Sequence, residues 1–240
     1  MYLNEEMIVL HVIPHKTGSV VLHVIGAIHG KMAIYVRGVG GNRSKTRLMI
    51  HPGAVLEMTY KHQANKDMQT GGGLRRVVYY KNIPGDVLRS SLVMFISEVV
   101  LKTTTDGEAQ KDQYDLIKTT LELTDLSEDF GNLHLFFLIS WIRLLGIDPI
   151  QRPTNEARID LFDGSWSDKV NGATTQLDPE LSALFSSVLG MNIDEILHVK
   201  MTRREKQKLL RAFVDYLCSQ LSINRKIESL EILEMIFDEM

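Results

Sequence analysis

The sequence predicts an α+β protein in which a small five-stranded β-barrel is followed by an all-α domain. Two patterns support this fold class. In the first 80 residues, apolar residues alternate with polar ones or form short β-branched runs, as they do in strands. After Pro84 the apolar residues recur at the spacing of amphipathic helices. We therefore expect one domain over residues 1–80 and a second over residues 81–240.

Five strands are expected in the barrel domain. The first two apolar runs are separated by a turn that contains proline and glycine, and two later segments alternate between apolar and polar residues. With a fifth segment, rich in β-branched and aromatic residues, the expected strands are residues 7–13, 20–26, 31–37, 55–62 and 74–80. So many short strands favour a closed or nearly closed barrel. Strand number alone leaves an SH3-like barrel as the alternative.

The all-α domain is expected to begin near residues 80–84. Helical spacing of apolar residues is found at residues 88–99, 116–123, 132–145, 180–189, 202–221 and 227–237. Pro149 and Pro153 follow the third of these segments and end it. A polar stretch with several glycines then continues to about Asp178. The predicted organisation is thus a barrel followed by consecutive helices.

Composition argues against several classes of protein. The chain is 44% apolar and 24% charged, which is ordinary for a globular domain and argues against disorder. Its one cysteine, Cys218, allows neither an internal disulfide nor a cysteine-based zinc site. No apolar run approaches the roughly 20 residues of a membrane-spanning helix, and the N-terminus lacks the basic flank of a signal peptide. We expect a cytoplasmic protein that does not enter membranes.

Catalytic and cofactor motifs are missing from the sequence. Residues 26–32 are one residue short of the phosphate-loop spacing and place Met32 where serine or threonine would bind Mg²⁺. Arg43 occupies the third glycine position of a dinucleotide-binding pattern. Most histidines lie in the first 80 residues, but without a recurrent metal-ligand spacing and with few acidic ligands nearby. We therefore expect no catalytic residues, no metal, no cofactor and no enzymatic activity.

The net charge of −3 conceals an uneven distribution of charges. Residues 1–80 contain 10 lysine and arginine residues and four acidic residues, which gives this part a charge of +6. The other 160 residues contain 17 basic and 26 acidic residues, which gives −9. A basic barrel next to an acidic helical region predicts a binding surface for a polyanion on the barrel.

One strand and the loop after it concentrate this positive charge. Residues 37–47 carry four basic side chains and no acid, and Tyr35 shares a strand face with basic residues. An aromatic ring among cations is typical of a single-strand-binding surface, where bases stack on the ring and cations neutralise phosphates. Two further arginines follow the expected flexible loop at residues 71–73 and extend the surface. The predicted DNA-binding residues are Lys31, Tyr35, Arg37, Arg43, Lys45, Arg47, Arg75 and Arg76. The alternative is a solvated charged loop without a ligand.

A second basic cluster lies at residues 200–211, where Glu205 is the one acid among six cations. On a helix, Lys200 would lie beside Arg204, and Arg204 beside Lys208, so that like charges face each other. This arrangement predicts a nearby acidic group, which is the acidic body of the chain itself, DNA or an acidic peptide partner. The residues predicted to contact a partner or DNA here are Arg203, Arg204 and Lys208.

Short motifs follow one another along nearly the whole chain. They are residues 8–11 and 19–24, 30–39 with the basic 43–45, 51–58, 132–149, 161–166 and 226–237. In order and spacing they resemble the RecO family of bacterial recombination mediators, with its first barrel strands, basic loop, central helix and last helix. The resemblance implies that the barrel is an OB-fold over residues 1–80 and that the helical domain covers residues 81–240.

The resemblance also implies a function in DNA repair and homologous recombination. Such proteins bind single- and double-stranded DNA and anneal complementary strands. With RecR they help to load RecA on DNA coated by single-stranded-DNA-binding protein, whose acidic tail they contact. These are non-enzymatic activities of a cytoplasmic, nucleoid-associated protein.

Two departures from the family pattern bear on this expectation. Some relatives carry a four-cysteine zinc site after the central helix, whereas residues 146–176 contain no cysteine, so zinc is not expected. The basic loop contains Gly40 and Gly41 where relatives are often more basic.

The alternative function is that of a non-enzymatic protein-interaction adaptor whose basic barrel does not bind DNA.

Overall fold

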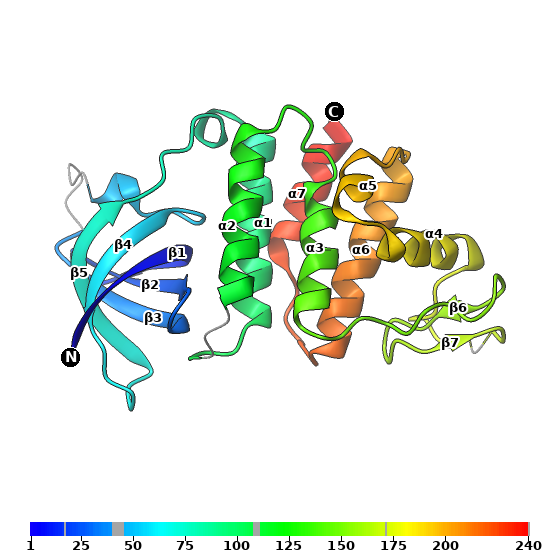
Figure 1. Ribbon diagram of the computed structural model, residues 1–240, viewed down its shortest axis with the longest axis horizontal. Coiled ribbons are helices and arrows are strands. Elements are labelled where there is room, and N and C mark those ends of the chain that lie inside the picture. The colour runs from blue at the N-terminus through cyan, green and yellow to red at the C-terminus, as the bar shows by residue number, and fades with distance from the viewer. Residues whose placement is uncertain (17, 40–45, 108–110, 171, 240) are drawn as a thin grey trace. The chain divides into compact units, whose positions relative to one another are not determined.

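The computed structural model describes residues 1–16, 18–39, 46–107, 111–170 and 172–239. The chain forms two compact units, Met1–Leu126 and Ser127–Met240. Figure 1 shows the barrel and helices α1 and α2 of the first unit, and the remaining helices and two short strands of the second. In the part of the chain described, no helix combines the length and the apolar character needed to cross a membrane.

Five strands form a closed barrel in the first unit, as the sequence predicts. They are β1 (Tyr2–His15), β2 (Ser19–Gly26), β3 (Gly30–Arg37), β4 (Val55–Lys61) and β5 (Met68–Arg76). Their order is β1-β2-β3-β5-β4, with β3 and β5 parallel and the other neighbouring pairs antiparallel. Alternate residues such as Val24, Ile34 and Met58 fill the interior of the barrel. The expected barrel followed by helices is thus confirmed.

The position of β5 differs from the prediction. A strand was expected at residues 74–80 after a flexible glycine loop, but β5 begins at Met68 and includes all three glycines. A Cβ atom on Gly71 would lie 2.8 Å from Ile34 Cγ2 and 3.1 Å from the carbonyl oxygen of Thr59. Glycine is therefore needed here because β5 approaches its two neighbouring strands closely.

Two helices, α1 (Val87–Thr103) and α2 (Lys111–Leu126), cover one side of the barrel within the first unit. Ile8 and Ile25 point outward from β1 and β2, yet both are buried. On α2, the Tyr114 hydroxyl and the Lys118 ammonium each donate to Glu6 on β1, at 2.7 Å. The outer surface of the barrel is therefore divided into a part that contacts helices and an exposed part.

The connection between barrel and helices is fixed by one carboxylate. Asp125, near the end of α2, accepts hydrogen bonds from the backbone N–H groups of Lys81, Asn82 and Ile83 at 2.8–2.9 Å. These residues lead into the 3-10 turn η2 (Ile83–Gly85), after which Asp86 caps α1. The expected change from strands to helices near residues 80–84 is found, although the compact unit extends to Leu126.

The second unit is mainly helical. Its elements are α3 (Leu133–Leu144), β6 (Arg158–Ile159), β7 (Trp166–Ser167), α4 (Pro179–Gly190), α5 (Ile193–His198), α6 (Arg203–Gln220) and α7 (Glu228–Glu239). Trp141 stacks on Phe137 within α3, and Phe185 of α4 stacks on Phe213 of α6. The helices predicted from periodicity are present. The six-residue α5 and the β6–β7 hairpin are not among the predicted elements.

Candidate nucleic-acid interface

One exposed region of the barrel surface is formed by β1, β2 and β3, and outward residues of β4 and β5 form another. Strand register places outward-facing residues in rows across these strands. The rows are His11 with His23, Ile13 with Val21 and Tyr35, and His15 with Ser19 and Arg37. None of these described strand residues is acidic. These strand residues thus combine aromatic rings with a cation and include no acidic side chain.

Tyr35 lies on β3, in the middle of the three rows of this surface. The guanidinium carbon of Arg37 lies 5.6 Å from the centre of the Tyr35 ring, and the His15 imidazole approaches the same ring edge-on at 5.5 Å. Hydrogen bonds with Ser19 and then with Arg37 lower the pKa of the Tyr35 hydroxyl. The ring is therefore fixed between neighbours of the kind that a stacked base and its phosphate require.

A pair of histidines adjoins the tyrosine. The rings of His11 and His23 are 6.3 Å apart on neighbouring strands. Burial and the nearby His11 lower the pKa of His23, while Asp106 acts in the opposite direction. The lowered pKa favours the neutral form of His23 at pH 7. Among the described residues, no group of three or more His, Cys, Asp or Glu side chains is arranged to hold a metal ion.

Lys31 lies at the opposite end of β3, next to the helices. Its ammonium donates to the carbonyl oxygen of Leu101 at 3.0 Å and forms an ion pair with Asp106 at 3.1 Å. The strand has the predicted alternation, with Lys31, Tyr35 and Arg37 on the outward side. Lys31 nevertheless contacts the end of α1, so its charge is already paired within the fold.

The end of β5 brings further cations to the barrel. Because β3 and β5 run parallel, their C-terminal residues Arg37 and Arg76 lie toward the same end of the barrel. Arg76 Nη2 donates to the carbonyl oxygen of Leu48 at 2.7 Å, next to the exposed Arg47 in the 3-10 turn η1 (Arg47–Met49). Arg75 forms an ion pair with Glu57 on β4.

Two of the predicted DNA-binding residues, Arg43 and Lys45, lie outside the described residues. Of the others, the structure brings Arg47 close to Arg76, and Tyr35 close to Arg37. His15 is not among the predicted residues, because its position beside Tyr35 depends on the pairing of β1 with β2 and of β2 with β3.

The second predicted cluster lies on α6. This helix begins at Arg203, after a capping box formed by Thr202 and Glu205. Lys200 precedes the helix, so the expected helical pairing of Lys200 with Arg204 is wrong. Arg204 and Lys208 remain one turn apart on α6. The expected acidic neighbour is present for Arg211, which makes two 2.6 Å hydrogen bonds with Glu234 of α7.

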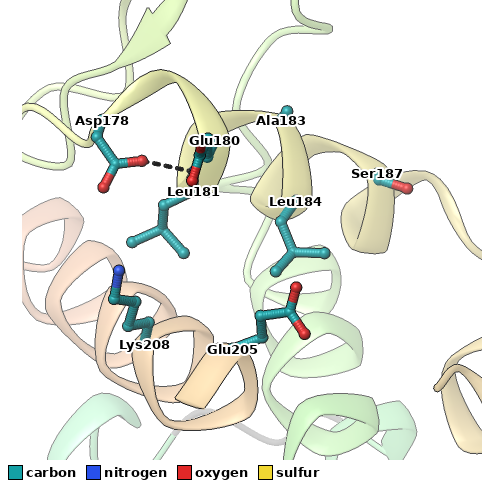
Figure 2. Close-up of a pocket in the computed structure, with 8 residues that line it drawn as sticks. All are labelled: Asp178, Glu180, Leu181, Ala183, Leu184, Ser187, Glu205 and Lys208. Carbon is teal, nitrogen blue, oxygen red and sulfur yellow. Dashed lines mark hydrogen bonds between the residues drawn. The ribbon is translucent and has the colours of Figure 1, made fainter. Parts of the chain in front are cut away.

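Two cavities adjoin these cations. One, of about 560 Å³, lies between α6 and α7 and is lined by Arg204, Lys208 and the exposed Met235 among others. The other, of about 400 Å³, lies between α4 and α6 and is lined by Leu181, Leu184 and Lys208 together with the acidic Asp178, Glu180 and Glu205. Figure 2 shows the Lys208 ammonium directed toward this second cavity. Lys208 therefore borders both cavities, each of which combines apolar and charged groups.

Comparison with known proteins assigns both parts of the chain. The family model described as "Recombination protein O N terminal" matches residues 1–73, and the model "Recombination protein O C terminal" matches residues 84–229. A "DNA repair protein RecO" of Azobacteroides pseudotrichonymphae is 23% identical over 250 residues, covering 99% of this chain and 100% of the relative. Proteins of the same name from Flavobacterium johnsoniae and Porphyromonas gingivalis are each 23% identical, over 242 and 257 residues, with the same coverage.

Proposed function

The chain belongs to the RecO family of DNA repair proteins, and we propose that it binds single- and double-stranded DNA through the exposed face of β1–β3 and anneals complementary strands. The observation that carries this proposal is the environment of Tyr35. Its ring lies beside Arg37 and His15 on a described strand surface without acids. We propose a non-enzymatic role, because the chemistry required is binding and charge neutralisation.

Two kinds of contact would hold a single strand on this face. Bases stack on the Tyr35 ring, and phosphates contact Arg37 together with the cations of residues 43–47. Such binding does not depend on base sequence, because every base offers a flat face for stacking. Affinity should fall steeply with salt, with a log–log slope of roughly −0.7 for each phosphate contact to a single strand.

Annealing follows from the same contacts. Phosphate neutralisation reduces the repulsion between two strands that lie on one basic surface. Contacts to phosphates and to base faces leave the pairing edges of most bases accessible. A second strand can therefore pair with the first while both remain bound.

We propose that α6 contacts the protein partners of the repair reaction. An acidic peptide, such as the tail of single-stranded-DNA-binding protein, would be attracted to Arg204 and Lys208 and would place apolar side chains in the cavity between α6 and α7. Arg203 lies at the exposed start of the same helix. With RecR as a second partner, the bound protein would help to load RecA, which it contacts indirectly.

The test of DNA binding is fluorescence anisotropy with labelled single strands of unrelated sequence at several salt concentrations. We expect two variants, Arg37→Ala and the triple variant Arg43→Ala, Lys45→Ala, Arg47→Ala, to bind every oligonucleotide more weakly by a similar factor. Both should also reduce the slope of affinity against salt concentration. Lys66→Ala is the matched control, since it removes an exposed cation in the turn between β4 and β5. Unchanged affinity and slope in the triple variant would show that the proposed surface is wrong.

The adaptor alternative makes a different prediction for the same titration, namely no salt-dependent binding of DNA by the unmodified protein.

A pull-down tests the proposed partner contacts of α6 separately from DNA binding. We expect Arg204→Glu with Lys208→Glu to release single-stranded-DNA-binding protein while DNA affinity is retained. The control is Lys169→Glu, an exposed lysine of the same unit. Retention of the partner by the double variant would contradict the assignment to α6.

A further inference from the structure

An exposed tyrosine lies between the barrel and the first helix. Tyr79 follows β5 and is 75% exposed, which is unusual for a large aromatic side chain. Neither the strand face around Tyr35 nor the basic loop includes it. Its position therefore calls for an explanation of its own.

The backbone around Tyr79 is held on both sides. Before it, the N–H group of Val77 donates to the carbonyl oxygen of Val55 at 3.0 Å. After it, the Tyr80 hydroxyl donates to the carbonyl oxygen of Gly53 at 2.9 Å, and Asn82 N–H donates to the Asp125 carboxylate at 2.8 Å. Tyr79 is thus presented to solvent by a fixed segment, so a ligand that contacts it meets an already ordered ring.

Arg76 lies over the ring of Tyr79. Its guanidinium carbon is 5.4 Å from the ring centre, and its Nη2 atom is held by the carbonyl oxygen of Leu48. This repeats the arrangement of Arg37 over Tyr35. Leu48, which is 77% exposed, adds apolar surface beside the pair. The result is an aromatic ring with a cation on it and an apolar neighbour.

The charges around the ring favour a polyanion over a protein surface. Arg47 is exposed one residue before Leu48, and Arg76 is in contact with the ring. The nearby acid Glu57 is already engaged by Arg75 and by the Asn4 side chain, whose Nδ2 donates to it at 2.5 Å. A ligand with a flat π-system and negative charges next to it satisfies all of these groups together.

We propose that Tyr79 and Arg76 form a second base-stacking subsite for single-stranded nucleic acid, with Arg47 positioned for the adjoining phosphate. This inference rests on the proposed function, since it concerns the same class of ligand. The subsite lies beyond the C-terminal end of β5, whereas Tyr35 lies on β3. A bound strand would therefore contact two rings, each with an arginine beside it.

The test compares three variants of the full chain in anisotropy titrations with single- and double-stranded DNA. Tyr79→Ala should weaken single-strand binding about 5- to 150-fold, which corresponds to ~1–3 kcal/mol of stacking per base. Tyr79→Phe should bind like the unmodified protein, because the ring is kept. The control Tyr2→Ala removes another tyrosine of the same barrel, 73% exposed, and should have no effect.

Two further readouts distinguish stacking from a phosphate contact or a loss of folding. The salt slope of Tyr79→Ala should be unchanged and its binding of double-stranded DNA retained, because paired bases are not available for stacking. Photocrosslinking of an oligonucleotide that contains 5-iodouracil should attach the base to Tyr79 in the unmodified protein, as located by peptide mass spectrometry.

Each outcome decides the inference. The subsite would be overturned if Tyr79→Ala bound single strands as tightly as the unmodified protein and the unmodified protein gave no crosslink at Tyr79. The proposed DNA binding would still stand in that case. Equal weakening of single and double strands would overturn stacking as the role of Tyr79, as would loss of RecR binding with normal DNA binding. Absence of DNA binding by the unmodified protein would refute the proposed function and the subsite with it.

Discussion

His134 provides a test of how burial in the second unit sets stability against acid. The side chain is on α3 and is 1% exposed. Burial, together with the nearby Lys206, lowers the pKa of His134 to about 3 from an ordinary value of 6.5. The folded chain therefore keeps this imidazole neutral in a pH range where the unfolded chain protonates it.

The sign and size of the effect follow from this difference in pKa. Because the unfolded state binds the extra proton, the free energy of unfolding falls as the pH falls below 6.5. Each pH unit between the two pKa values costs about 1.4 kcal/mol. Lowering the pH from 7.5 to 5.0 should therefore remove about 2 kcal/mol through His134 alone. The contribution is fully present above the unfolded pKa.

The assay is urea unfolding at pH 7.5 and pH 5.0, followed by tryptophan fluorescence in a Trp166→Phe background. The remaining Trp141 is buried and lies on α3, the same helix as His134. Between pH 7.5 and pH 5.0, we expect the free energy of unfolding to fall by about 2 kcal/mol less in His134→Leu than in its parent. His134→Gln is the second variant, and His198→Leu removes an exposed histidine of the same unit as the control. Identical pH dependence in the His134 variants and the parent would refute the reasoning.

Three further predictions concern packing and buried charge. Gly71→Ala should lower stability by about 1–3 kcal/mol in thermal unfolding, since its Cβ has no room, whereas Gly72→Ala, with open space around it, should change little. Asp125→Ala leaves three backbone donors without their acceptor and should cost about 3 kcal/mol. Burial alone would raise the pKa of Asp125, but these donors lower it. The contribution of Asp125 to the free energy of unfolding should therefore persist above pH 3.8 and be lost on acidification, as measured by urea unfolding. Arg211→Met leaves the Glu234 side chain, 10% exposed, without its partner and should increase hydrogen exchange in α7; unchanged exchange would contradict this.

The strands that could be predicted are those whose apolar residues alternate with polar ones or form short β-branched runs. Tyr35 and Arg37 alternate with apolar residues along β3, so their shared face is visible in the sequence. The start of β5 was not predicted, because Gly71 and its neighbours give the local signal of a turn. Their strand conformation depends on how closely Ile34 and Thr59 approach in the closed barrel, which local sequence does not contain.

The candidate site shows the same division between local and tertiary information. The alternation along β3 also placed Lys31 on the outward face, but its pairing with Asp106 and Leu101 depends on how α1 ends beside the barrel. Tyr79 was included in an expected strand at residues 74–80, where it had no separate role. Its exposure and its contact with Arg76 follow from the end of β5 at Arg76, which leaves Tyr79 outside the strand.

The buried outward residues of the barrel determine where the chain can be divided for experiments. A fragment that ends at residue 80 would expose Ile8, Ile25 and Val55, which are at most 1% exposed in the complete first unit. It would also leave Glu6 without Tyr114 and Lys118. Such a fragment should self-associate through this apolar surface. The smallest fragment of the barrel suited to measurements in dilute solution is therefore residues 1–126, in which α1 and α2 act as an internal solubilising cover.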